Sequence, residues 1–452
     1  MDRTHRPNDE QKMRILLTVS FFLFISCANH NVKIHGEAHK MAETDNAIGM
    51  LANDTVPFAQ IGRLDKNRIL IEHDFDLNGK TCRLPKGITL CMRGGVIKNG
   101  FIYGDETRIS GKGPFFDKVT ICGSWNVPDI STSLFADMNY ENSLKDVVAL
   151  ANPKVKNVIV VDEGIYYVRA LKRSDACVSL CSNTDFILNG SISLSANGLK
   201  GYNIVLAKGD NIRISGNGSI IGDKHTHTGT EGEWGMGVRF HGARNSSVNG
   251  LKIKDCWGDC IYVGGNSKNI LIENCQLDHG RRQGVSITKA DGVTIRNCRI
   301  SNVGGKNPEY AIDVEPNKGD TVDNVVIENV VIDNCEGGIV AARPVPKRNK
   351  KATRWIGNVT IKDCLVTANS KRPMSFRKCD KVIVENNMIY KTNDNPAVSA
   401  EHIESIMINN NTIRVNDNRP DSGLMNKEAS VPHMNITETK VQKVNDNIIV
   451  AK

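Results

Sequence analysis

Apolar and polar residues alternate over short stretches along most of the chain, and the stretches recur. A typical one is KNILIENCQL (268–277), where Ile and Leu alternate with polar residues, an Asn-Cys pair follows, and a second apolar residue resumes the pattern. A period of two is typical of strands with one buried face, and Asn and Gly clusters are typical of turns. The pattern therefore predicts short strands separated by tight turns.

The unit repeats down the chain. Runs that start at residues 245, 268 and 292 share its pattern. The others are NIRISGNGSI (211–220), NVVIENVVIDNC (324–335), NVTIKDCLV (358–366), KVIVENNMI (381–389) and SIMINNNTI (405–413). A unit of about 22–24 residues with two or three strands cannot bury its inner face alone, so stacked neighbours must supply the core. We therefore predict an all-β fold, a single right-handed parallel β-helix with an N-terminal cap or a short first β section.

The same patterns divide the chain into five parts. Residues 1–27 form a signal, and 28–65 a linker or cap. An N-terminal β section with a cap helix, predicted from the helical spacing of NSLKDVVALAN (142–152), occupies 66–155. The β-helix covers 156–416, and 417–452 is an irregular tail with a final coil.

The N-terminus predicts export. Lys12 and Arg14 precede an apolar run (15–25) that ends at Ser26-Cys27. Basic residues, a short apolar run and a small residue describe a secretory signal, and the run is too short for a comfortable membrane span. The cysteine makes it resemble a bacterial lipoprotein signal, with Cys27 lipidated and the protein anchored outside the cytoplasm, at the outer membrane or cell surface. A plain signal peptide with an incidental cysteine is the alternative.

Charge and composition indicate which classes of binding partner to expect. The net charge is +8 and only 5% of residues are aromatic. Such a mild basic excess suits an acidic glycan. The sequence has no basic stripe with interleaved aromatic residues, so we do not expect a nucleic-acid partner. We expect a monomer that binds a polysaccharide, and that polysaccharide can be an acidic one.

Cysteines recur with the repeat. Those at 256, 275, 298, 335 and 364 all follow Asn or Asp at the same point of the unit. This predicts one internal column of reduced cysteines that pack as small hydrophobic residues. One or more disulfides are the alternative in an exported chain.

A further strand follows the turn in each unit, and these strands can be aligned on one inward apolar residue. The aligned residues are Val238, Ile261, Val285, Ile312, Ile339 and Met374. Alternation then places two rows outside, and stacked strands lie about 4.8 Å apart. One face over four coils therefore collects Arg239, His241, Tyr262, Asp313 and Glu315. Insertions beside it hold Trp234, Tyr310 and Arg343.

Three of these coils carry a resemblance. GDCI (258–261), QGVSI (283–287) and AIDVE (311–315) follow one another in the order of motifs in polygalacturonase-type glycoside hydrolases, within the pectate-lyase-like β-helix superfamily. That family carries G-D-D-C-I, G-H-G-x-S-I and G-I-R-I-K on consecutive coils. The resemblance implies the β-helix fold and a possible acid or base role for Asp259.

The departures from that family change the expected substrate. One aspartate of the pair is absent, and Gln283 stands where a histidine would be. Asp313-x-Glu315 replaces the Arg-x-Lys that would hold a uronate carboxylate. A galacturonan substrate therefore does not carry over.

Asp313 and Glu315 are the leading candidates for chemistry. Two residues apart on one strand face, their Cα atoms lie roughly 6.6–7 Å apart. Their side chains can then reach either carboxyl separation used by glycosidases. We predict hydrolysis of glycosidic bonds with Asp259 in support, and a sugar held by Arg239, Tyr262, Arg282, Arg343, Trp234 and Arg377. No cofactor is required. Calcium is possible because carboxylates are its ligands, but the His225 and His227 spacing does not predict a metal site.

Other interpretations stay open. A lyase or uronate epimerase would use Tyr310 or His241 as base and an arginine to neutralise the carboxylate. A non-catalytic solenoid would only bind glycans. Asp259 could be a simple turn residue, and Asp313 and Glu315 could pair with Arg282 or Arg343.

Overall fold

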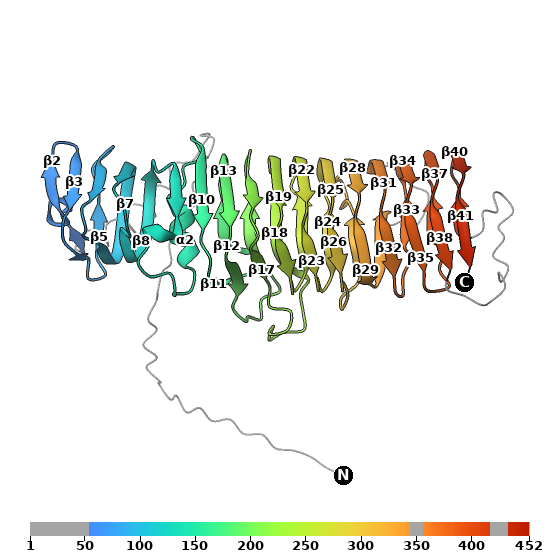
Figure 1. The fold of residues 1–452 in the computed structure, drawn as a ribbon, viewed down its shortest axis with the longest axis horizontal. Helices are drawn as coiled ribbons and strands as arrows, with labels where there is room; N and C mark the ends of the chain where they lie inside the picture. The colour runs from blue at the N-terminus through green and yellow to red at the C-terminus, as the bar shows by residue number, and fades with distance from the viewer. Residues whose placement is uncertain (1–53, 344–355, 416–432, 452) are drawn as a thin grey trace, which may run out of the picture.

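The computed structural model describes residues 54–343, 356–415 and 433–451, which form a long stack of β-coils (Figure 1). Three sheets run along the stack, and all their neighbouring strands pair in parallel. This is a parallel β-helix, as the repeat predicted. The predicted signal with Cys27, most of the linker and much of the tail lie outside the described residues. None of the helices in the described part is long and apolar enough to cross a membrane.

Each coil contributes a strand to each of the three sheets in turn. The first sheet contains β9 (Asp129–Ser131), β10 (Asn157–Val161), β13 (Thr184–Leu188), β16 (Arg213–Ser215), β19 (Arg244–Asn249), β22 (Ser267–Glu273), β25 (Ala290–Arg296), β28 (Val322–Glu328), β31 (Ile356–Lys362), β34 (Cys379–Glu385), β37 (Ser405–Asn409) and β40 (Val441–Asn445). The second sheet contains β11 (Ile165–Val168), β14 (Ser191–Leu194), β17 (Ser219–Ile221), β20 (Lys252–Lys254), β23 (Gln276–Asp278), β26 (Arg299–Ser301), β29 (Val331–Cys335), β32 (Leu365–Ala368), β35 (Met388–Lys391), β38 (Thr412–Val415) and β41 (Ile448–Ala451). The third sheet contains β12 (Asp175–Leu180), β15 (Gly201–Ala207), β18 (Trp234–His241), β21 (Asp259–Gly264), β24 (Gln283–Ile287), β27 (Tyr310–Val314), β30 (Gly337–Ala342), β33 (Met374–Arg377), β36 (Val398–Glu401) and β39 (Met434–Thr437).

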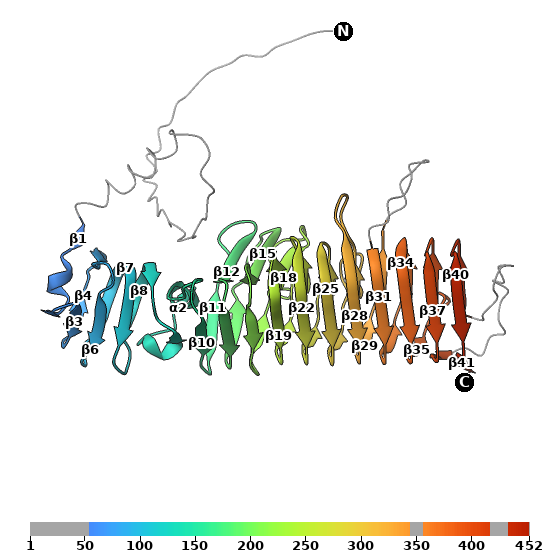
Figure 2. The same ribbon diagram turned by 90° about the horizontal axis from the view of Figure 1, so that it is seen from above.

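A separate sheet begins the stack. It contains β1 (Thr55–Val56), β2 (Arg63–Asp65), β3 (Arg68–Ile71), β4 (Phe75–Asp76), β5 (Thr81–Arg83), β6 (Thr89–Met92), β7 (Ile97–Ser110) and β8 (Phe116–Trp125), with 3-10 turns at Phe58–Gln60 and Thr132–Leu134. Helix α2 (Ser143–Ala149) lies within the segment predicted to be helical and packs against β8, β11 and β12 (Figure 2). One continuous hydrophobic core runs from Ile61 to Ile436, so the described chain is a single solenoid.

The corners of the coils explain where the cysteines lie. Asn274 (φ 54°) turns the chain from the first sheet to the second, and Asp255 (φ 56°) turns it from the second to the third. Asn and Asp tolerate this left-handed conformation better than most residues. The predicted single cysteine column is therefore wrong. Two corners use the same Asn/Asp-Cys signal, so Cys275, Cys298 and Cys364 follow the first corner, and Cys256 and Cys335 the second. These five cysteines form no disulfide, and all five are buried.

The third sheet has the predicted register. Val238, Ile261, Val285, Ile312, Ile339 and Met374 pair from strand to strand, and each is fully buried. In the next position Arg239 pairs with Tyr262, Tyr262 with Ser286, and Ser286 with Asp313. The polar row predicted on one face is therefore continuous over four coils.

Candidate active site

Asp259 stands where the alternation of the third sheet is interrupted. Cys260 and Ile261 are both fully buried, so the chain turns a corner into the core at this point. Asp259 instead contacts the outer polar row, where the Ser286 hydroxyl lies 2.7 Å from its Oδ2. Asp259 is itself fully buried. The corner thus brings a buried carboxyl group against the row that holds Asp313.

Gln283 connects the two aspartates. It pairs with Asp259 in the strand register and is itself fully buried. Its amide Nε2 donates a hydrogen bond to Asp313 Oδ2, and its Oε1 accepts one from Arg282. The Ser286 hydroxyl lies between Gln283 Oε1 and Asp259. A single amide therefore fixes the position of groups that come from three successive coils.

Arg282, directly before β24, is the cation of this site. Its Nη2 donates to Glu315 Oε1 at 2.7 Å, its Nη1 lies 3.5 Å from Asp259 Oδ1, and its Nε lies 3.7 Å from Glu233 Oε2. Its side chain is only 13% exposed. We call Arg282, its three carboxylate neighbours and Asp313 the carboxylate cluster. The cluster holds four acidic side chains and one guanidinium, so carboxylates already balance the charge of Arg282.

Burial sets the protonation of the two aspartates. It raises the pKa of Asp259 to about 7, against the opposing effects of Arg282 and of the Ser286 hydrogen bond. Burial, and then the charge of Glu315, raise the pKa of Asp313 well above its usual range. Glu315 differs because its side chain is 32% exposed and pairs with Arg282. A buried carboxyl group with a raised pKa thus lies two residues from a partly exposed carboxyl group that is paired with Arg282.

An inserted loop between β17 and β18 supplies Glu233 and leads directly to Trp234, the first residue of β18. Asp223, at its start, accepts a hydrogen bond from the Tyr202 hydroxyl and pairs with His227 Nδ1 at 2.8 Å. Both the Asp223 and His227 side chains are fully buried. These contacts attach the loop firmly to the coils and so position Glu233 against Arg282.

Arg281 holds the other end of the same loop. It donates to the carbonyl oxygens of Thr230 and Gly232 at 3.1 and 2.9 Å, and its guanidinium carbon lies 3.6 Å from the centre of the Trp257 ring. The His227 ring stacks on Trp257 at 3.8 Å. Arg281 is therefore a structural residue, although it neighbours Arg282.

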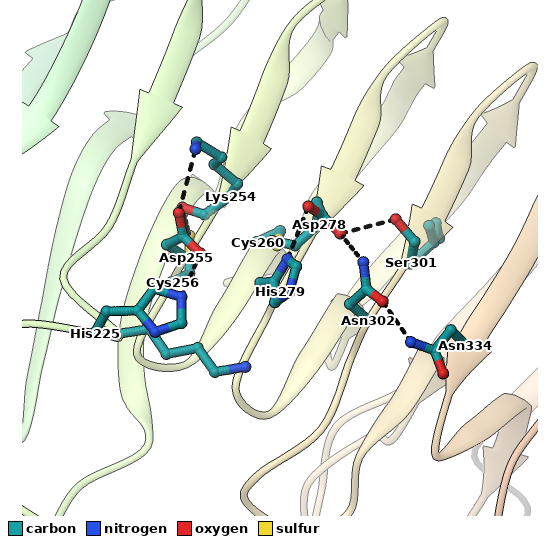
Figure 3. Close-up of polar contacts among 12 residues, drawn as sticks. His225, Lys254, Asp255, Cys256, Cys260, Asp278, His279, Ser301, Asn302 and Asn334 are labelled. Carbon is teal, nitrogen blue, oxygen red and sulfur yellow. Dashed lines mark hydrogen bonds and ion pairs between the residues drawn. The ribbon is translucent and has the colours of Figure 1, made fainter.

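The histidines of the adjacent corner are engaged with carboxylates of their own. Figure 3 shows His225 against Asp255 at 3.0 Å and His279 against Asp278 at 2.8 Å. Asp278 also accepts a hydrogen bond from Asn302, which continues the polar ladder to the next coil. In the described part of the chain, no group of three or more His, Cys, Asp or Glu side chains is arranged to hold a metal ion. The corner ties the inserted loop to the coils.

A second group of predicted residues lies further along the same face. The Arg239 guanidinium carbon is 5.0 Å from the centre of the Tyr262 ring, and Arg239 Nη2 is 3.4 Å from His241 Nδ1. The Tyr262 hydroxyl shares a hydrogen bond with Thr288 at 2.8 Å. Burial, and then the charge of Arg239, lower the pKa of His241. We call Arg239, His241 and Tyr262 the arginine–tyrosine group.

Three other predicted residues contact groups outside the carboxylate cluster. The Tyr310 ring, whose hydroxyl pKa is raised by burial, lies 5.9 Å from Lys371 Nζ. Arg343 donates to the carbonyl oxygens of Pro316 and Asn317 at 3.3 and 2.8 Å, which supports the loop after β27. Arg377 pairs in register with Ala342 and Glu401, beyond the coil of Glu315.

Trp234, in contrast, lies next to a residue of the carboxylate cluster. It begins β18 directly after Glu233, and 45% of its surface is exposed. Its ring lies 5.0 Å from the Arg173 guanidinium carbon. An exposed indole beside the cluster can pack against an apolar sugar face.

Sequence reasoning did not select Gln283, Ser286 and Glu233 as site residues. Ser286 had a signal, because it stands between Tyr262 and Asp313 in the outer row. Gln283 had one too, at the position where the related family has histidine. Glu233 had none, because its position depends on how the inserted loop folds back.

Residues 177–344 match a family model described as a right-handed β-helix region. Two curated Bacillus subtilis proteins match shorter stretches: uncharacterized protein YclG, 35% identical over 129 residues (24% of this chain and 22% of that protein), and SPbeta prophage-derived uncharacterized protein YorA, 28% identical over 162 residues (30% and 28%). The chain thus spans about a quarter of the length of these relatives.

Among solved structures, a hyperthermoactive exopolygalacturonase from Thermotoga maritima is similar with a TM-score of 0.48 and 15% identity, over 71% of this chain and 91% of that one. This level of similarity does not transfer an activity. The family match agrees with the stacked parallel sheets and adds their handedness. Residues 177–344 are thus similar to a right-handed β-helix region.

Proposed function

We propose that the protein hydrolyses glycosidic bonds of a polysaccharide at the carboxylate cluster. The observation that supports this most directly is that two unlike carboxyl groups lie two residues apart, at the end of β27 and directly after it. Asp313 is buried with a raised pKa, and Glu315 is partly exposed and paired with Arg282. Glycosidases need one protonated and one ionised carboxyl group on either side of the bond that they cleave.

Four residues of the cluster have a role in the proposed reaction. Asp313 donates its proton to the glycosidic oxygen as the bond to the anomeric carbon breaks. Glu315 takes the proton of the water that attacks that carbon, or attacks it directly as a nucleophile. Arg282 holds the Glu315 carboxyl group in place through a hydrogen bond, while Gln283 orients Asp313. Asp259 supports the cluster through its contacts with Arg282 and Ser286. The exposed Trp234 ring provides a surface for the sugar.

The proposal extends to the location of the protein. The apolar run at 15–25 and Cys27 favour export and lipid anchoring, so the substrate would be met outside the cytoplasm. Labelling with a fatty acid, with Cys27→Ala as the comparison, tests the anchor.

The activity is tested with the purified chain and a panel of neutral and acidic polysaccharides. Hydrolysis releases reducing ends without new ultraviolet absorbance. Release of unsaturated uronides, which absorb in the ultraviolet, would replace hydrolysis by elimination. Binding without either product, unchanged by Asp313→Asn, would establish a non-catalytic glycan-binding solenoid.

Stability should depend on pH through Asp259. Its pKa is about 7 in the folded protein against a usual value of 3.8. The contribution of Asp259 to the free energy of unfolding is therefore complete below pH 3.8 and is lost as the pH rises through about 7. We expect the free energy of unfolding to fall between pH 4 and pH 8, by roughly 4 kcal/mol at most from this group. Urea denaturation at several pH values measures it.

The matched variants are Asp259→Asn and Asp291→Asn. The first removes the buried titrating group and should flatten the pH dependence. The second changes an exposed aspartate of the first sheet and should leave it as in the wild-type protein. An unchanged slope in Asp259→Asn would contradict the raised pKa.

Calcium is not expected to take part. The carboxylates that could hold it already surround Arg282, and a divalent cation would have to displace that guanidinium. We expect EDTA to change the cleavage rate by less than about twofold, since no step needs a Lewis acid. A loss of activity that added calcium restores would contradict this.

A further inference from the structure

The arginine–tyrosine group differs from the carboxylate cluster in its balance of charge. Arg239 Nη1 lies 3.5 Å from Asn203 Oδ1, and its Nη2 faces His241. Its Nε is buried without a hydrogen-bond partner. Within the described residues, no carboxylate lies at ion-pair distance from Arg239. Arg282, by contrast, faces three carboxylates.

The surroundings of Arg239 add no negative charge. The pKa of His241 is lowered by burial, then by the charges of Arg239 and Lys208. His241 is therefore neutral near pH 7, and Lys208 is a second cation close by. Tyr262 offers its ring and is bonded to Thr288. The guanidinium keeps its capacity to bind an anion, because a planar fork of N–H donors matches a carboxylate or a sulfate.

The two groups lie on one line along the stack. In the register of the third sheet, Arg239 pairs with Tyr262, Tyr262 with Ser286, and Ser286 with Asp313. Three strand spacings of about 4.8 Å place Arg239 roughly 14 Å from Asp313. A glycan that runs along this face contacts the carboxylate cluster with one sugar and Arg239 with another.

Resting on the proposed hydrolysis at the carboxylate cluster, we propose that Arg239, with His241 and Tyr262, is an anion-binding subsite separate from the cleaved bond. It selects a mixed polysaccharide. A neutral sugar occupies the carboxylate cluster, where an acidic one would be repelled and would find no unengaged cation. A sugar that carries a carboxylate or a sulfate ester binds Arg239 further along the chain.

Binding measurements on the full chain test the subsite. Hyaluronan carries a carboxylate on alternate sugars, and κ-carrageenan carries a sulfate on alternate sugars. Their neutral counterparts are carboxyl-reduced hyaluronan and desulfated κ-carrageenan, and polygalacturonate has a carboxylate on every sugar. Affinities are compared by calorimetry in wild-type protein and in an Asp313→Asn background, which excludes turnover.

We expect at least one alternating anionic glycan to bind more tightly than its neutral counterpart and than polygalacturonate. The glycan that does so separates the carboxylate from the sulfate. Arg239→Gln should weaken that binding by about tenfold or more, because it removes a charged hydrogen-bond donor, and should leave the neutral counterpart unaffected. Arg239→Lys should retain part of the preference. Arg213→Gln, an exposed arginine of the first sheet that pairs with Asp185 at 3.3 Å, should change nothing.

Equal affinity for the charged and neutral partner of both pairs would overturn the subsite, as would an Arg239→Gln variant that weakens both partners alike. The outcome is independent of the cleavage assay. Arg239-dependent binding without any cleavage would refute the hydrolysis and leave the subsite in place. Equal cleavage of the charged and neutral glycans, without Arg239-dependent binding, would support the hydrolysis and refute the subsite.

Discussion

Asp313→Asn is expected to reduce the rate of glycosidic-bond cleavage by about a thousandfold while the coils stay folded. Asparagine has nearly the same shape but carries no proton that it could donate to the leaving oxygen. Its side-chain oxygen can still accept the hydrogen bond from Gln283 Nε2, so the network around it is preserved. Reducing-end release under saturating substrate measures the rate, and thermal denaturation followed by circular dichroism checks the fold.

The control is Asp333→Asn, which removes an aspartate of the second sheet that is 47% exposed and pairs with Arg299. It should keep full activity. Glu315→Gln should lose activity to a similar degree, because it removes the carboxyl group that acts as base or nucleophile in the proposed reaction. Full activity in both Asp313→Asn and Glu315→Gln would place the chemistry elsewhere on the solenoid.

Arg282→Met should have the largest effect on stability. Methionine fills part of the same space but leaves Asp259, Asp313 and Glu315 without their cation. Removing one partner of a buried ion pair costs about 3–5 kcal/mol, because the remaining charge stays buried and uncompensated. We expect a loss of this size at pH 8. At pH 5 it should be smaller, because the buried carboxyl groups can take up protons.

Urea denaturation of Arg282→Met at the two pH values measures both effects. Arg299→Met is the matched comparison, since Arg299 pairs with an aspartate at 2.6 Å but is 53% exposed, and such surface pairs contribute little. Arg282→Lys should recover part of the stability, but not the contacts that Arg282 makes with three carboxylates at once. If Arg282→Met and Arg299→Met behave alike, Arg282 does not hold the cluster together.

The register of the third sheet was predictable from the sequence. A strand alternates its side chains with a period of two, and stacked coils must place apolar residues above one another to share a core. Aligning Val238 with Ile261 and Val285 was therefore enough to place Arg239, Tyr262 and Asp313 in one outer row. The repeat predicted the parallel β-helix for the same reason.

The Asn-Cys signal shows what such local patterns can and cannot predict. It marks a corner because Asn and Asp adopt the left-handed conformation, but it does not say which corner of the coil is meant. Cys275 and Cys256 carry the same local sequence signal and lie in different columns. Only the stacking of whole coils separates them.

The composition of the carboxylate cluster was decided by the tertiary structure. Asp259 follows a glycine, as many turn residues do, and its sequence neighbours do not show that the chain enters the core at Cys260 and Ile261. Arg282 and Glu233 reach the cluster from a turn and from an inserted loop, whose paths depend on contacts far away in the sequence. The raised pKa values of Asp259 and Asp313 depend on burial by neighbouring coils. The sequence by itself thus determined the coils and the row of outward residues, because these follow from local periodicity. Which carboxyl groups are buried, protonated and paired was decided only when separate coils stacked.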